Sequence, residues 1–436
     1  MRLLSIWTNL IVALLLCASC GGGPQPPQKN IESKSISEDM PAPIVKVYVE
    51  NSGSMNGYVK GATDFENAVY SYLSDLQLAD LGVKADSSFK NVMELNYINS
   101  EILQQTSDIK EFIDKLEPST FKQVGGDLGT SDISNIIGKI LENLNNEEIA
   151  VLVSDCIFSP GKKYKIQDNA DDYLVAQQIG IKNHIAKAMV NNHNLSFVVM
   201  RLLSQFDGKY YNKFDENKYI KDTRPFYIWL IGSSQYLKKV MSAVDYHKIK
   251  GTGVQNIYAV SSAIGNINYS ILPQPRIGKF APDKESPKTS IINAKTENKG
   301  GSNMFQLSIG VDYSNLLLED EYLLDSNNYE ISNKSYSLEV TKNSNQSSSY
   351  THIIKLTLNQ PIISRGTVKI SLLNKMPQWV YDFNDADGLD IHAAGAMEKT
   401  YGLRYLVEGV YDAFASSDKF ATITIHINDE KKKKQE

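Results

Sequence analysis

The sequence predicts an α/β domain with a mostly parallel central sheet flanked by helices, followed by a β-rich, sandwich-like domain. Between residues 44 and 250, apolar runs of strand length alternate with segments whose apolar residues recur at helical spacing. Strands that are apolar on both faces and separated by helices are typical of a parallel sheet covered on both sides. From residue 255 to residue 436, strand-length segments instead alternate apolar and polar residues, as antiparallel strands with one solvated face do.

The α/β domain begins with an apolar run that starts at Ile44 and stops at Glu50. Thr63 and Glu66 then form a capping-box pair, and apolar residues recur at helical spacing as far as Leu76. The remaining pattern predicts further strands over 92–98, 149–154, 195–203 and 226–231, and further helices over 108–116, 133–144, 171–190 and 237–244.

In the β-rich domain the segments between strands are rich in Asn, Ser, Gly and Pro, which favour turns. One late helix is expected from the apolar residues between Leu403 and Phe414. Residues 282–302 are expected to form a loop or insertion. The predicted strands cover 304–313, 336–341, 352–358, 367–372 and 420–427.

Oxygen-bearing side chains follow two of the predicted strands in the α/β domain. The first strand stops at Glu50-x-Ser52-x-Ser54, and the strand that ends at Ser154 is followed by Asp155. Ligands of open α/β sheets bind beyond the carboxyl ends of the strands, where these residues fall. Carboxylates and hydroxyls suit a hard cation such as Mg²⁺, and Thr130, before a predicted helix, offers one more hydroxyl.

These motifs resemble the metal-ion-dependent adhesion site of von Willebrand factor type A domains, over about residues 42–250. That family carries D-x-S-x-S after its first strand, then a loop threonine, then an aspartate after a later core strand. The resemblance implies a Rossmann-like fold. It also implies that Ser52, Ser54 and Thr130 bind the metal directly. Glu50 and Asp155 would act mainly through bound water.

The same resemblance implies Mg²⁺ as the cofactor, with Mn²⁺ or Ca²⁺ as substitutes, and a protein partner that supplies an acidic residue to the ion. The sequence departs from the family at Glu50, Ser154 and Cys156, where aspartate, threonine and glycine are usual. The longer Glu50 either binds the ion directly or tilts the site. In the alternative interpretation no metal binds, and Ser52 and Ser54 only cap the turn that follows.

The first 19 residues have the pattern of a secretory signal, with Arg2, an apolar segment and then small residues. Because Cys20 follows Ala-Ser directly, the segment resembles a bacterial lipoprotein signal in which Cys20 becomes acylated (palmitate-type chains). Residues 20–43 would then be a flexible tether spanning roughly 25–30 Å. We expect the lipid to anchor the protein to a bacterial envelope membrane, the outer membrane in particular. Both the periplasmic and the outer face of that membrane fit the sequence.

Charge and motif content favour a binding protein over an enzyme. The formal net charge of −5 gives no overall basic field that would favour a nucleic-acid partner. The chain lacks H-E-x-x-H, G-x-S-x-G and phosphate-loop motifs. The acidic stretch 381–392 has the wrong spacing for a calcium loop and is interpreted as a solvated turn. Two alternatives stay open: a metal-free scaffold of the cell envelope, and a metal-assisted phosphoesterase using Asp155 and Glu50.

Overall fold

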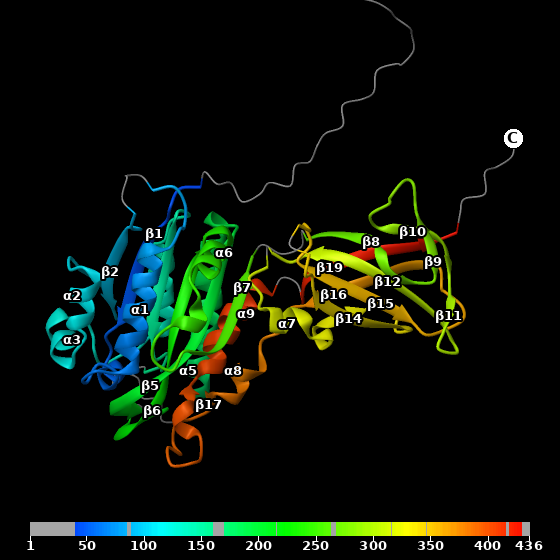
Figure 1. Cartoon of the computed structure of the whole chain (residues 1–436). Coiled ribbons are helices and arrows are strands. Elements are labelled where there is room, and N and C mark those ends of the chain that lie inside the picture. Colours follow the sequence, from blue (N-terminus) through cyan, green and yellow to red (C-terminus); the bar gives the residue numbers. More distant parts are fainter. Residues whose placement is uncertain are drawn as a thin grey trace, which may run out of the picture. The chain divides into compact units, whose positions relative to one another are not determined.

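The computed structural model describes residues 40–84, 89–159, 170–214, 216–262, 267–314, 316–345, 347–415 and 418–429. The predicted signal at 1–19, the acylated Cys20 and most of the 20–43 tether lie outside these residues. Within them, no helix is long and apolar enough to cross a membrane. Figure 1 shows the elements in chain order.

A seven-stranded sheet forms the centre of the first part of the chain, in the strand order β3-β2-β1-β4-β6-β5-β7. Only the pairs β1/β2 and β1/β4 are parallel, and the other four pairs are antiparallel. The strands are β1 (Ile44–Glu50), β2 (Met93–Ile98), β3 (Ile102–Gln105), β4 (Glu148–Ser154), β5 (Leu195–Tyr211), β6 (Asn217–Ser233) and β7 (Val254–Ser261).

The expected fold class is therefore wrong: the sheet is mixed, and the chain shows no clear Rossmann-like arrangement of the von Willebrand type. The prediction placed 22 residues between two separate strands, 195–203 and 226–231, which is enough for a crossover connection. In the structure those residues extend both strands to 17 residues each and join them by a short turn. A hairpin of this kind makes the two strands antiparallel.

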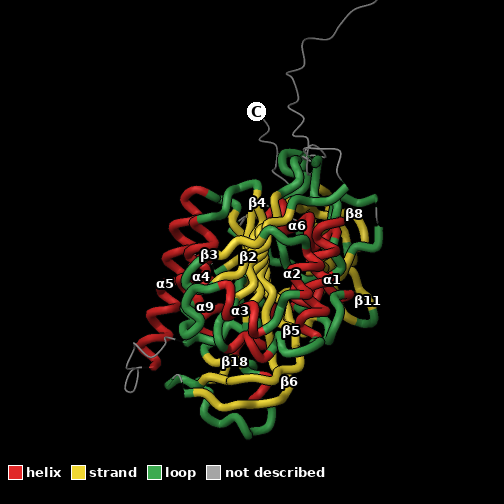
Figure 2. The backbone as a smooth tube through the Cα atoms, turned by 90° about the vertical axis from the view of Figure 1, so that its left-hand side faces the viewer, coloured by secondary structure: helices red, strands yellow, loops and turns green. Residues whose placement is uncertain are grey.

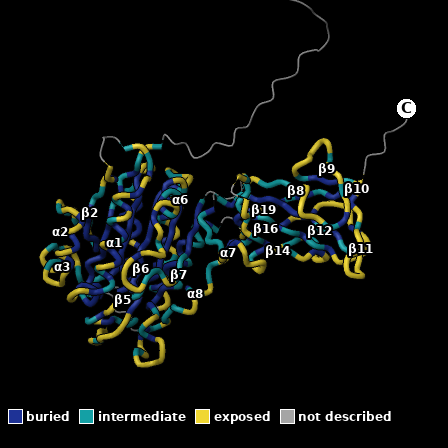
Figure 3. The backbone as a smooth tube through the Cα atoms, viewed as in Figure 1, coloured by how far each residue is buried: buried dark blue, intermediate teal, exposed yellow. Residues whose placement is uncertain are grey.

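Helices cover both faces of this sheet, as Figure 2 shows. On one face α1 (Asp64–Leu78), α2 (Ile109–Asp114) and α6 (Ser234–Ala243) contribute buried residues such as Leu73, Phe112 and Leu237 to one core. On the other face α4 (Ile133–Glu142), α5 (Ala170–Asn191) and α9 (Leu403–Phe414) contribute Ile137, Ile181 and others to a second core. The central strands are buried, while exposed residues lie on the outer surfaces of the helices and in loops (Figure 3).

Later parts of the chain return to the first sheet. Strand β7 pairs with β5, and α9 packs against α5 although more than 200 residues separate them. The predicted boundary between residues 250 and 255 stays an interpretation of the sequence.

The remaining helices are α3 (Pro118–Val124), α7 (Asp320–Leu324) and α8 (Gln378–Asp382), with short 3-10 turns η1 (Ser54–Gly57), η2 (Tyr246–Lys248), η3 (Ser326–Asn328) and η4 (Ala396–Glu398).

Two five-stranded, largely antiparallel sheets share a third core built from residues such as Phe305, Ile354 and Ile423. Residues 282–302, expected to be a loop, contain β10 and β11. The strands are β8 (Asn268–Ile277), β9 (Lys279–Pro282), β10 (Ser290–Lys295), β11 (Glu297–Lys299), β12 (Ser302–Asp312), β13 (Tyr329–Ile331), β14 (Tyr336–Lys342), β15 (His352–Leu358), β16 (Gly366–Leu373) and β19 (Lys419–Asn428). A separate two-stranded sheet pairs β17 (Asn384–Asp385) with β18 (Thr400–Tyr401).

Candidate functional site

Two buried carboxyl groups lie at the carboxyl ends of neighbouring parallel strands. Glu50 is the last residue of β1, and Asp155 follows β4 directly. The register pairs Val49 with Val153, so the two strands end side by side. Both side chains are completely buried. The parallel pairing at the centre of the sheet therefore brings together the two acids that the sequence predicted to be neighbours.

Hydroxyl groups surround the Glu50 carboxylate. The Ser131 hydroxyl donates to Glu50 Oε1 at 2.6 Å, and the Ser154 hydroxyl donates to Glu50 Oε2. The hydroxyl oxygens of Ser52 and Ser54 lie 3.1 Å apart, and both residues are buried. We call these residues the acid–serine cluster: Glu50, Ser52, Ser54, Ser131, Ser154 and Asp155.

Asp155 has one satisfied and one unsatisfied oxygen. Its Oδ1 accepts from the backbone N–H of Ile157 at 3.2 Å. Its Oδ2 is buried and accepts no hydrogen bond of good geometry among the described residues, although the Ser54 hydroxyl is near enough to lower the pKa of Asp155. A buried acceptor without a partner costs about 1–3 kcal/mol, and more if it is charged. This oxygen therefore needs a proton, a water molecule or a cation.

Burial keeps both acids from ionising freely, and the charge of Asp155 adds to this effect at Glu50. Desolvation, and then the charge of Asp155, raises the pKa of Glu50 from 4.5 to about 7, against the opposing effect of the serine hydroxyls. Desolvation also raises the pKa of Asp155, opposed by Ser54, by the N–H of Ile157 and by Arg224. Like charges held together in a buried site disfavour double ionisation. A cation would remove that penalty.

Arg224 is a buried cation near this cluster. Its guanidinium lies 4.4 Å from the ring centroid of Tyr210 and donates to the backbone oxygen of Lys399 at 3.4 Å. Its positive charge lowers the pKa of Asp155. Part of the negative charge of the cluster is therefore offset by the protein itself.

The structure does not bring Thr130 into the cluster. Thr130 is partly exposed, and its hydroxyl donates to Asp127 Oδ2 at 3.0 Å. The neighbouring Ser131 is buried, and its backbone bonds to Ser159 in both directions. The predicted loop thus reaches the site, but the hydroxyl it delivers comes from the next residue. Spacing in the resembled motif pointed to Thr130, and no periodic pattern in the loop distinguishes the two residues.

The cluster fits a hard cation by its chemistry. Its side-chain donors are all oxygens, it includes two carboxylates, and one carboxylate oxygen is unpartnered. Among the described residues there is no group of three or more His, Cys, Asp or Glu side chains that could hold a metal ion. Any ion here would therefore depend on serine hydroxyls and water for most of its ligands.

Two other sequence features have structural roles. Asp385 Oδ1 accepts from the backbone N–H groups of Asp387 and Gly388, so the acidic stretch 381–392 caps its own turn. Cys156 is buried, and its sulfur accepts from Trp229 Nε1 at 3.3 Å. Burial raises the pKa of this thiol far above its ordinary value. A thiol of this kind is unreactive.

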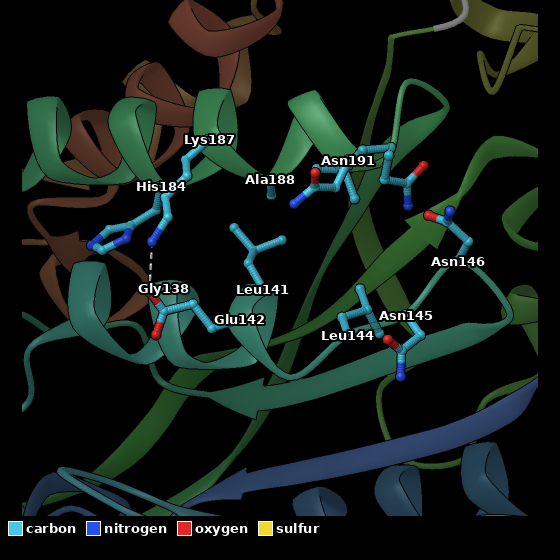
Figure 4. Close-up of a pocket in the computed structure, with 12 residues that line it drawn as sticks. Gly138, Leu141, Glu142, Leu144, Asn145, Asn146, His184, Lys187, Ala188 and Asn191 are labelled. Atoms are coloured by element: carbon cyan, nitrogen blue, oxygen red, sulfur yellow. Dashed lines mark hydrogen bonds and ion pairs between the residues drawn. The ribbon is translucent and has the colours of Figure 1, made fainter.

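A separate hollow of about 350 Å³ lies between α4, α5 and the loop that precedes β4, and Figure 4 shows its side chains. Its polar residues include Asn145, Asn191 and His184, and Lys187 forms an ion pair with Glu142 at 3.1 Å. Because β4 begins at Glu148 beside this hollow and ends at Ser154, the hollow and the acid–serine cluster lie at opposite ends of the strand. The hollow is not part of the candidate site.

Comparison with protein-family models, with curated proteins and with solved structures gives no match for this chain. The resemblance to von Willebrand factor type A domains thus has no support beyond the motif itself.

Proposed function

We propose that the protein binds a divalent cation, Mg²⁺ in particular, at the acid–serine cluster, and that the ion lets it bind a protein partner through an acidic residue. Lipid on Cys20 would hold the protein at a bacterial envelope membrane, with no enzymatic role. The observation that carries the proposal is the buried, unpartnered Oδ2 of Asp155 beside a second buried carboxyl group.

The residues that would hold the ion are Ser52, Ser54, Asp155 and Glu50, with Ser131 in the place first assigned to Thr130. When bound, the ion supplies positive charge that allows both carboxyl groups to ionise. The serines hold Glu50 in position by hydrogen bonds at its two carboxylate oxygens. Neutral hydroxyls also leave residual positive charge on the ion, which favours an acidic ligand from a partner.

Access to the cluster depends on the loop over residues 125–130. The backbone N–H of Gly53 donates to the oxygen of Leu128 at 2.9 Å, which fixes this loop against the turn that carries Ser52 and Ser54. Both serines are no more than 4 % exposed. A partner carboxylate can therefore reach the ion only after the loop moves.

Thermal unfolding in Mg²⁺, Mn²⁺, Ca²⁺ or chelator tests the metal claim. A ligand that binds only the native state at 100 times its Kd adds about 2.7 kcal/mol of stability. We expect the wild type to melt at a higher temperature with metal, and Asp155→Asn to lose this response. Asp127→Asn is the control, because Asp127 is an exposed acid in the adjacent loop. Unchanged wild-type melting with all three ions would remove the proposal.

Partner binding is tested by capture from envelope extract with wild-type protein and with Asp155→Asn, each with Mg²⁺ and with chelator. We expect a protein captured only by the wild type and only with Mg²⁺. Capture that is equal in all four conditions would contradict a metal-bridged contact.

The second candidate is a metal-free scaffold of the cell envelope. It is favoured by the charge balance already present, because two serine hydroxyls satisfy Glu50 and Arg224 offsets Asp155. Deleting residues 255–436 would not separate the two candidates, because that segment includes most of β7 and all of α9, which belong to the first sheet and its core. Glu50→Gln separates them: a scaffold would keep its partner, whereas metal-bridged binding would weaken.

A further inference from the structure

Four apolar side chains that are each more than half exposed lie at the amino-terminal end of β1 and β2. Backbone hydrogen bonds hold the segments that carry them together. The N–H of Asn91 donates to the oxygen of Gln77 at 2.8 Å, and the N–H of Val45 donates to the oxygen of Val92 at 2.9 Å. We call these residues the apolar end: Leu78, Val83, Phe89 and Val92.

The segment that leads to the predicted lipid anchor meets the rest of the protein at this place. The N–H of Ala42 donates to the oxygen of Val83 at 2.7 Å, and the N–H of Val83 donates to the oxygen of Met40 at 2.9 Å. The predicted tether places about 20 residues between Cys20 and Met40, for which a random coil would span roughly 25 Å. An anchor on Cys20 would therefore keep the apolar end within a short distance of the lipid.

Charges around the apolar end are mixed. Lys90 is exposed, with its ammonium 5.6 Å from the ring centroid of Phe89, and Lys84 follows Val83. Asp80, in the same turn, is exposed as well. The two lysines favour a surface with negative charge, but Asp80 offsets one of them, so the apolar side chains must supply most of the binding.

We infer that the apolar end docks onto the bilayer that holds the lipid anchor, with Phe89 and Val83 entering the region between headgroups and acyl chains. The inference rests on the lipid anchor of the proposed function. Weak docking suffices, because the tether makes the contact effectively intramolecular. Docking also sets an orientation. Since β1 is seven residues long, the acid–serine cluster at its other end lies about 20 Å further from the bilayer, where a partner can approach it.

The test uses the full lipidated protein in vesicles of phosphatidylethanolamine and phosphatidylglycerol whose acyl chains carry bromine, which quenches tryptophan. Phe89→Trp places a tryptophan reporter at the apolar end. Ile362→Trp is the matched control, because Phe89 and Ile362 are 70 % and 77 % exposed. Phe89 precedes β2, whereas Ile362 lies between β15 and β16, so the two residues adjoin strands of different sheets. We expect Trp fluorescence at position 89 to fall about twofold or more, since side chains docked at the interface reach the acyl boundary. Fluorescence at position 362 should stay unchanged.

A second measurement removes the anchor. In the mature Cys20→Ser chain, Val83→Ser with Phe89→Ser should weaken sedimentation with the same vesicles by roughly five- to tenfold, because apolar burial drives the contact. Ile362→Ser should leave it unchanged.

The mass of the processed protein shows whether Cys20 carries lipid, and this separates failure of docking from failure of the proposed anchor. If Cys20 carries lipid and the reporter at position 89 is not quenched, docking is overturned while the anchored binding protein stands. If the Trp at position 89 is shielded from solvent only when envelope proteins are added, this surface binds a protein. That result would also overturn docking. If Cys20 carries no lipid, both the anchor and the docking fall.

Discussion

Glu50 and Asp155 occupy the adjacent ends of β1 and β4, both fully buried, and the charge of Asp155 is one of the causes that raise the pKa of Glu50 to about 7. This pairing follows from the strand register, and it makes the ionisation of the two acids a property of the folded state. Its consequences can be measured without knowing the partner.

Stability in chelator should fall as pH rises from about 5 to 8. The pKa of Glu50 is higher in the folded protein than its ordinary 4.5, so the folded state binds more protons than the unfolded state over this range. The contribution of Glu50 to the free energy of unfolding is fully present below its unfolded pKa, and it is lost as pH rises through its folded pKa. The loss should be on the order of 3 kcal/mol, because each pKa unit is worth about 1.4 kcal/mol.

Urea unfolding at pH 5 and pH 8 measures this change. Glu50→Gln should flatten the dependence. Glu66→Gln is measured beside it, because partial burial also raises the pKa of Glu66 to about 7 and this carboxyl adds a slope of the same sign that must be subtracted. A wild type that becomes more stable between pH 5 and pH 8 in chelator would contradict the assignment.

Ser131→Ala should destabilise the protein by about 1–3 kcal/mol, because Glu50 Oε1 would lose its hydroxyl donor inside the core. Thr130→Ala is the matched variant and should cost about 0.5 kcal/mol or less, since the Thr130 hydroxyl bonds to the exposed carboxylate of Asp127 and not to the buried cluster. Urea midpoints at pH 8 give both values. The reverse order would mean that Thr130, and not Ser131, serves the cluster.

Most elements of the sheet could be predicted from the sequence, but their direction could not. The cap at Thr63 was identified correctly, because its side chain accepts from the N–H of Glu66 at 3.4 Å as the capping box requires. The sequence pattern does not predict the β5–β6 hairpin because the outer half of β6 is polar and exposed, which hides strand character from a hydrophobic pattern. Asn212 holds the hairpin turn by accepting from the N–H groups of Phe214 and Glu216.

The candidate site could be predicted to within one residue in its loop. The carboxyl groups of Glu50 and Asp155 come together because they end strands that are correctly predicted and parallel. The choice between Thr130 and Ser131 depends on how the loop lies over the sheet. That arrangement is set by long-range contacts such as the bond between Gly53 and Leu128, which no local pattern encodes.

Gly126→Ala should destabilise the protein more than Gly125→Ala. Both glycines have positive φ, so either substitution introduces backbone strain of order 1 kcal/mol. A Cβ at Gly126 would also lie 2.1 Å from Asn99 Oδ1, whereas a Cβ at Gly125 meets nothing within 4 Å. Asn99 cannot easily move, because its amide donates to Asn51 and to the oxygen of Gly125. We expect a total of about 2–3 kcal/mol for Gly126→Ala in urea unfolding, and equal costs would show that the loop rearranges freely.

Arg224→Met should strengthen Mg²⁺ binding while it weakens the metal-free protein. The guanidinium is buried and lowers the pKa of Asp155, so its removal leaves the two acids with less positive charge nearby. Loss of a buried charge that offsets another costs about 3–5 kcal/mol. A bound cation would recover part of that loss, so the Mg²⁺-dependent rise in melting temperature should be larger than in the wild type.

Arg201→Met is the matched control, because Arg201 is also buried but is not among the main causes of the Asp155 pKa shift. It should destabilise the protein without changing the response to Mg²⁺. If neither variant responds to the ion while both remain folded, the acids bind no cation even without the Arg224 charge, and the metal-free scaffold becomes the better account. A larger response in Arg224→Met alone would show that the ion and the guanidinium compete for the same pair of carboxylates.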